Sequence, residues 1–194
     1  MNVRLDGFTV LAGIECDIRA DGTMDLADET LAHLDLVIAS VHSGFNQGPQ
    51  EMTDRVLRAL DNPYVDIIGH PTGRKLLQRD PHGLDVEALI DAAAARGVAL
   101  EINSNYHRLD LNDIQARRAK DKGVRLVISS DAHSTEELRM LRWGVTVARR
   151  AWLTPADVLN TRSVDDFRAA LRRRRSAKSA SASRRPSRSS STGR

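Results

Sequence analysis

The stretch Arg125–His133 constrains the fold of this chain more than any other. It reads Arg-Leu-Val-Ile-Ser-Ser-Asp-Ala-His, so an apolar, β-branched run of strand length ends in Asp-x-His. Side chains alternate between the two faces of a strand, so we expect Asp131 and His133 to point the same way. A carboxylate beside an imidazole at a strand end is typical of one half of a metal site.

The rest of the chain alternates strand-like runs with helical patterns. Further apolar runs cover residues 8–15, 36–42, 65–70 and 98–103, and helical patterns cover 25–33, 49–61, 85–96, 111–122, 135–151 and 163–174. This alternation predicts an α/β fold with a parallel sheet, and the near-continuous apolar strands indicate that both of its faces are covered. An open doubly wound sheet and a closed barrel both fit the pattern.

Side chains that can bind metals stand at the carboxyl ends of the expected strands. Glu15, His42 and His70 follow one another at intervals of 27 and 28 residues, and Asp131 comes 61 residues later. One βαβ unit takes about 30 residues, so these intervals correspond to one, one and two units. The carboxyl ends of parallel strands share one rim, where we expect these groups to converge with Glu101 of the fourth strand.

This mixture of imidazole and carboxylate groups favours Zn²⁺, Mn²⁺ or Fe²⁺, and more than four ligands suggest more than one ion. A two-metal site is suited to the hydrolysis of phosphate esters, because the ions activate a shared water and neutralise charge on the phosphoryl oxygens. Other candidates have simpler interpretations. We expect His33 and His82 on the surface and Cys16 in the core. Asp17 is either a ligand or an acid of the loop, of which we favour the loop, and His107 is left open.

Charge divides the chain into two parts. Residues 172–194 hold nine basic residues and no acidic ones, whereas residues 1–171 hold 20 basic and 26 acidic residues. We predict a folded domain over residues 1–175 and a disordered, Ser/Arg-rich basic tail over residues 176–194, which either binds DNA phosphates or raises solubility. We expect a cytoplasmic protein without a membrane partner, because no apolar run is long enough to cross a bilayer and no signal pattern opens the chain.

Six short motifs together follow a known pattern: Gly13–Ile18, Ala39–Ser43, Asp66–Arg74, Glu101–Asn103, Arg108–Leu111 and Ser130–His133. Over about residues 3–160 the chain resembles a PHP (polymerase and histidinol phosphatase) domain. It is most similar to the PHP domain at the C-terminal end of bacterial family X DNA polymerases.

The resemblance implies a distorted, TIM-like barrel of seven strands with up to three Mn²⁺ or Zn²⁺ ions at its rim. By position, Glu15 matches a bridging carboxylate, and His42, His70, Asp131 and His133 match further ligands; Glu15 and Asp131 would be the catalytic carboxylates. The implied activity is a phosphoesterase that acts as a 3′–5′ exonuclease on DNA ends, with a metal-bound hydroxide as nucleophile. Arg74 and Arg108 are candidates for phosphate binding or for salt bridges at the rim.

The chain departs from the family pattern at its start. A PHP domain opens with a strand that carries His-x-His, and this sequence contains no such motif. We therefore expect the C-terminal part of a PHP domain, with the first strands of the barrel missing and an upstream chain as one way to complete it. Weak metal binding and little hydrolysis follow from this expectation. A histidinol-phosphatase-like enzyme for small molecules and a non-catalytic remnant that serves as a partner subunit are the alternatives.

Overall fold

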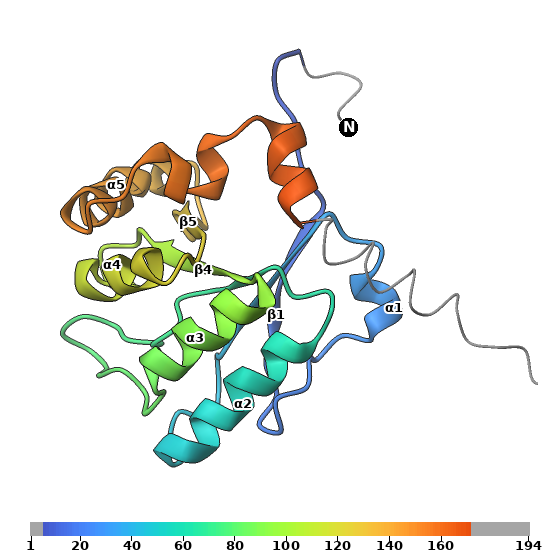
Figure 1. Ribbon diagram of the computed structural model, residues 1–194, viewed down its shortest axis with the longest axis vertical. Coiled ribbons are helices and arrows are strands. Elements are labelled where there is room, and N and C mark those ends of the chain that lie inside the picture. The colour runs from blue at the N-terminus through green and yellow to red at the C-terminus, as the bar shows by residue number, and fades with distance from the viewer. Residues whose placement is uncertain (1–5, 172–194) are drawn as a thin grey trace, which may run out of the picture.

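A computed structural model describes residues 6–171 of the chain, which form a parallel sheet covered by helices (Figure 1). Five strands pair within this range: β1 (Gly13–Asp17), β2 (Leu36–Ser40), β3 (Ile67–Ile68), β4 (Ala99–Asn103) and β5 (Leu126–Ser129). The helices are α1 (Asp28–Leu31), α2 (Pro49–Asp61), α3 (Val86–Arg96), α4 (Asp113–Asp121) and α5 (Leu141–Arg150). Shorter 3₁₀ turns are η2 (Glu136–Met140), η3 (Pro155–Asp157) and η4 (Leu159–Thr161), and residues 164–171 are also helical.

Two further sequence predictions concern the tail and the membrane. The predicted disordered tail, residues 176–194, lies outside the described residues. Within the described range, no helix is long and apolar enough to cross a membrane.

The order of the strands distinguishes between the two architectures that the sequence left open. All five strands are parallel and lie in the sheet in chain order, from β1 to β5. Right-handed connections between strands in this order place every connecting helix on the same side, whereas a doubly wound sheet reverses its order to use both sides. In Figure 1, α2, α3, α4 and α5 follow one another along one side of the sheet. The arrangement is therefore that of part of a TIM-like barrel.

Local sequence signals account for the ends of the longer helices. The Asp85 carboxylate caps α3 by accepting a hydrogen bond from the Ala88 N–H at 3.1 Å, and Gly97 ends the helix in the left-handed region with φ 67°. In α4, Asn112 and Gln115 form a reciprocal capping box. The helices predicted over residues 49–61 and 85–96 are confirmed with these bounds to within one residue.

The two faces of the sheet differ in chemistry. The outer face packs apolar strand residues such as Ala39, Leu100 and Leu126 against the helices. On the inner face, Ile67, Ala99 and Val127 form a second apolar cluster, which is covered by the C-terminal segment through Leu159, Phe167 and Ala170. Further along the strands, towards their carboxyl ends, the inner face becomes polar. The candidate site lies in this polar layer.

Candidate metal centre

The polar layer is built by strand register. Glu15 pairs with Ile38 and Asp17 with Ser40, so these side chains share the inner face with their partners on β2. Asn103 pairs with Ser129 in the same way across β4 and β5. His42 and His70 follow β2 and β3 by two residues each. All five strands therefore deliver polar groups to one end of the inner face.

Glu15, His42 and His70 lie in direct contact and form the candidate metal triad. Glu15 Oε1 is 2.9 Å from Nε2 of His70 and 3.2 Å from Nε2 of His42, and the two nitrogens are 3.3 Å apart. One ligand atom from each residue lies within 4.8 Å of the others. The structure thus brings together three of the five ligands that the sequence nominated. His70 is buried, while Glu15 and His42 are about one-third exposed.

The Glu15 carboxylate and the His42 imidazole of the triad shift each other's pKa values towards the charged forms. Hydrogen bonds from His42 and His70 hold the pKa of Glu15 far below its usual range. Glu15, and after it Asp17, raises the pKa of His42 to about 9. Asp17 hydrogen-bonds to Nδ1 of His42, on the side of the ring away from Glu15. The interpretation of Asp17 as a loop acid was wrong, because it is the last residue of β1 and orients His42 from the strand.

A second carboxylate, Glu101, lies beneath the triad. It is buried, and it accepts hydrogen bonds from the His70 backbone N–H and from the Ser129 hydroxyl. Burial raises the pKa of Glu101, and the groups that donate to it partly offset this effect. Since one oxygen holds the backbone of His70, Glu101 fixes the position from which the imidazole reaches Glu15.

Asn103 connects Glu101 to the Asp131 side of the site. Its Nδ2 lies 3.4 Å from Glu101 Oε2 and 3.1 Å from Asp131 Oδ2. Its Oδ1 accepts from the Asn105 N–H at 3.0 Å, which fixes the orientation of the amide. The fully buried Asn103 side chain is therefore a bridge between two carboxylates.

Asp131 and His133 lie beyond the end of their strand and not within it. Strand β5 ends at Ser129, and Asp131 has a left-handed backbone with φ 52°. Strand alternation therefore does not explain their placement, but the two side chains do lie side by side, with His133 Nδ1 3.9 Å from Asp131 Oδ1. The Asp131 side chain is 14% exposed and that of His133 80% exposed, with His133 Nδ1 bonded to the Asp131 carbonyl at 2.9 Å. Neither residue belongs to the contact cluster of Glu15, His42 and His70.

The two candidate arginines make protein contacts. Arg108 Nε is 3.3 Å from Asp131 Oδ2, and both side chains are mostly buried. The Arg74 guanidinium donates to the backbone carbonyls of Arg108, at 2.8 Å, and Leu109. Arg74 therefore ties the loop after β3 to the loop after β4, and Arg108 acts as the counter-cation of Asp131.

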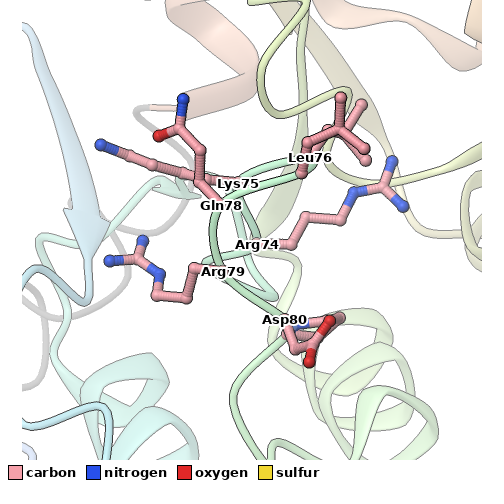
Figure 2. A pocket seen from close by; sticks show the side chains of 8 residues that line it. Arg74, Lys75, Leu76, Gln78, Arg79 and Asp80 are labelled. Atoms are coloured by element: carbon pink, nitrogen blue, oxygen red, sulfur yellow. The ribbon is translucent and has the colours of Figure 1, made fainter.

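The loop after β3 forms an open pocket of about 400 Å³, lined by residues 74–81. Figure 2 shows Arg74 and Leu76 on one side of this loop and Lys75, Gln78 and Arg79 on the other. The loop is held in shape by Arg79, which donates to the Gly73 carbonyl and lies 3.8 Å over the Phe45 ring. The loop therefore carries three cations, Arg74, Lys75 and Arg79, and one acidic residue, Asp80.

His82 is a buried residue that sequence reasoning missed. The prediction of a surface position was wrong, because the polar connection folds back and the His82 N–H donates to the Thr72 carbonyl at 3.0 Å. The ring stacks on Phe45, and burial, together with Arg55 and Arg79, lowers its pKa to about 4. The predictions for His33, which is exposed, and for Cys16, which is in the core, are confirmed.

Comparison with known proteins finds relatives that align with most of the chain. It is 44% identical over 173 residues to the DNA polymerase/3′-5′ exonuclease PolX of Bacillus subtilis, a match that covers 89% of this chain and 30% of that protein. It is 31% identical over 182 residues to a probable phosphatase of Caldanaerobacter subterraneus, covering 89% of this chain and 69% of the relative. A probable phosphatase of Thermoanaerobacter sp. is 32% identical over 168 residues, covering 81% and 66%.

The chain spans under a third of the polymerase and about two thirds of the probable phosphatases. No family model matches it. The long alignments nevertheless agree with the barrel-like order of the strands and with the position of the triad at their carboxyl ends. The chain belongs to the PHP family and is related to the PHP domain of the bacterial polymerase PolX.

Proposed function

We propose that this chain acts as a metal-dependent phosphoesterase. The observation that carries the proposal is the contact between Glu15 and the two imidazoles, in which Glu15 Oε1 lies 2.9 and 3.2 Å from the Nε2 atoms of His70 and His42. The names of the relatives, a polymerase–exonuclease and several probable phosphatases, support hydrolysis of a phosphate ester.

The donor set fits a divalent ion. One carboxylate and two imidazoles are a ligand combination that suits Mn²⁺ and Zn²⁺. The bond between His42 Nδ1 and Asp17 is the support that a metal-binding histidine usually receives, and it directs Nε2 towards Glu15. A bound ion would lower the pKa of a water molecule and neutralise charge on the phosphoryl oxygens. Asp131 and His133 would supply ligands for further ions, up to three in all.

The residues around the triad have separate roles in this proposal. Glu101 fixes the backbone of His70, and Asn103 holds Asp131 at a set distance from Glu101. Glu15 and Asp131 are the catalytic carboxylates. Arg108, beside Asp131, would place a cation next to the phosphate, whereas Arg74 supports the loop that carries Arg108.

We further propose DNA 3′ ends as the substrate and a cytoplasmic location. The relative with 44% identity is named a 3′-5′ exonuclease, and its match covers 89% of this chain. The five strands would belong to a barrel of seven, with residues 1–175 as the folded unit and the basic residues 176–194 as a tail that contacts DNA. An upstream segment, in the same protein or in a partner, would supply the other strands.

A small-molecule phosphatase of the histidinol phosphate type is the second candidate. It is favoured by the probable phosphatases, because the chain covers a larger share of these relatives than of the polymerase. A non-catalytic remnant is the third, and it predicts neither metal binding nor turnover.

Hydrolysis assays separate these candidates. The chain, with Mn²⁺ or Zn²⁺, is assayed on a 3′-labelled oligodeoxynucleotide, on bis-p-nitrophenyl phosphate and on p-nitrophenyl phosphate. We expect slow turnover of the two diesters that is lost in Glu15→Gln and kept in the matched surface variant Glu29→Gln. Preference for the monoester would favour the small-molecule phosphatase. If Glu15→Gln retained the turnover of the wild type, the proposed site would be wrong.

A further inference from the structure

Helix α5 exposes apolar side chains on the face turned away from the sheet. Gly144, Val147 and Ala148 pack inwards and are buried. Trp143 and Trp152 are 41% and 72% exposed, and Leu138, Leu141 and Val145 of the same segment and Ile114 of α4 are exposed as well. Isolated exposed apolar residues are common, so the two tryptophans indicate a binding surface only together with the charges beside them.

The same surface is cationic on an otherwise acidic body. Residues 138–156 contain Arg139, Arg142, Arg149 and Arg150 and no acidic residue, although residues 1–171 have six more acidic than basic residues. All four arginines are exposed, and among the described residues only Arg150 has an acidic partner, Asp113. The remaining guanidinium groups are available to an anionic ligand.

Two arginine–tryptophan pairs lie on this surface. The Arg142 guanidinium carbon is 4.7 Å from the centre of the Trp143 ring, and that of Arg117 is 5.6 Å from the centre of the Trp152 ring. Single-stranded nucleic acid is bound by this combination, since the bases stack on aromatic rings while cations follow the phosphates. A protein partner would require apolar contacts but would not account for a row of unpaired arginines.

The surface begins at the rim of the metal centre. Glu137, in η2, accepts a hydrogen bond from the His133 N–H at 2.7 Å. Gly144 of α5 packs against Ser104, which directly follows β4, so closely that a side chain at this position would meet the Ser104 hydroxyl. From there α5, which Figure 1 shows beside β5, extends for ten residues or about 15 Å.

We propose that the surface formed by Leu138, Arg142, Trp143, Arg149 and Trp152 binds single-stranded nucleic acid that extends from the metal centre. The inference rests on the proposed function for the path of the strand, but binding itself does not require catalysis. It assigns to α5 a contact with the part of the substrate beyond the reacting phosphate.

Fluorescence anisotropy with a labelled oligo-dT tests the proposal on the full chain. Trp143→Ala and Arg142→Ala are compared with Arg96→Ala, which removes the same charge from α3 and breaks only a surface ion pair with Asp61. We expect Trp143→Ala to weaken binding by about fivefold or more, as for loss of one stacked base. Arg142→Ala should weaken binding and reduce its salt dependence by about one phosphate contact.

Unchanged affinity in both variants, relative to Arg96→Ala, would overturn the proposal. It would also be overturned if light scattering showed a dimer that Trp143→Ala dissociates without any loss of oligonucleotide binding, since the surface would then join two copies. Circular dichroism checks that each variant is folded. Hydrolysis of bis-p-nitrophenyl phosphate, which is too small to reach α5, reports separately on the proposed function, so either idea can fail alone.

Discussion

The two halves of the candidate site are built in different ways. Glu15, His42 and His70 lie on or just after three neighbouring strands and touch one another directly. Asp131 and His133 lie beyond the end of β5, where Asp131 contacts Arg108 and Asn103 while His133 extends into solvent. The first half is set by sheet register, whereas the second depends on a loop.

This difference predicts an order of binding. A first divalent ion meets three ligand atoms that are already together, within 4.8 Å of one another. A further ion would have to compete with Arg108 for Asp131 and order an exposed histidine, which costs side-chain entropy. We therefore expect one tighter site and weaker additional sites.

The largest effect is expected from Glu15→Gln. The substitution removes the carboxylate shared by both imidazoles, and even loss of a group that only supports a ligand costs about 10- to 100-fold in affinity. Titration calorimetry with Mn²⁺ should show at least a hundredfold loss at the tighter site, while Glu29→Gln keeps the affinity of the wild type. If Glu15→Gln lost less Mn²⁺ affinity than His133→Ala, the tighter site would lie at His133 and not at the triad.

His133→Ala should have a smaller effect on the first ion. Its side chain is 80% exposed and lies outside the triad, so affinity at the tighter site should change by less than about threefold, with any loss confined to the weaker sites. His33→Ala, which removes another exposed histidine, is the control. Equal losses at all sites would show that His133 joins the triad when metal is bound.

Asn103→Ala tests the bridge between the halves. The change leaves the polar groups of Glu101, Asp131 and Asn105 with one partner fewer, so we expect a loss of about 1–3 kcal/mol in the free energy of urea unfolding. It should also lower kcat more than it raises KM. Ser104→Ala is the matched control, since its hydroxyl is equally buried and has no hydrogen-bond partner among the described residues. If the two variants had equal effects, the Asn103 side chain would not act as a bridge between Glu101 and Asp131.

Arg108→Gln should affect substrate binding and not the first metal ion, because Arg108 lies beside Asp131 and outside the triad. We expect KM for bis-p-nitrophenyl phosphate to rise by about threefold to tenfold, as for loss of a charged hydrogen bond, with the tighter metal site unchanged. Arg117→Gln on α4 serves as control. A change in kcat alone would indicate that Arg108 acts through Asp131 rather than on the phosphate.

Much of the fold could be predicted from the sequence, because local patterns determine it. The apolar runs, the cap at Asp85 and the glycine at position 97 specify where strands and helices begin and end. The interval of one βα unit also indicates that Glu15, His42 and His70 stand at neighbouring strand ends, because each strand pairs with the next one along the chain.

The remaining features depend on contacts between distant residues. The left-handed turn at Asp131 leaves no pattern in the sequence, so the position of His133 could not be predicted. His82 looks like a loop residue because its neighbours are polar, and only the return of that loop towards Thr72 buries it. Asn103 belongs to one of the six short motifs, but its role as a bridge follows from the packing of β4 against β5.

The agreement between sheet order and chain order has a consequence for biosynthesis. A ribosome releases β1, β2 and β3 before β4 and β5, and each new strand needs only the edge formed by the one before it. The strands that carry Glu15, His42 and His70 can therefore pair while the chain after His70 is still being translated, and Glu101 on β4 fixes the backbone of His70 afterwards. A metal ion captured at that moment would hold three nascent βα units together before the rest of the sheet exists.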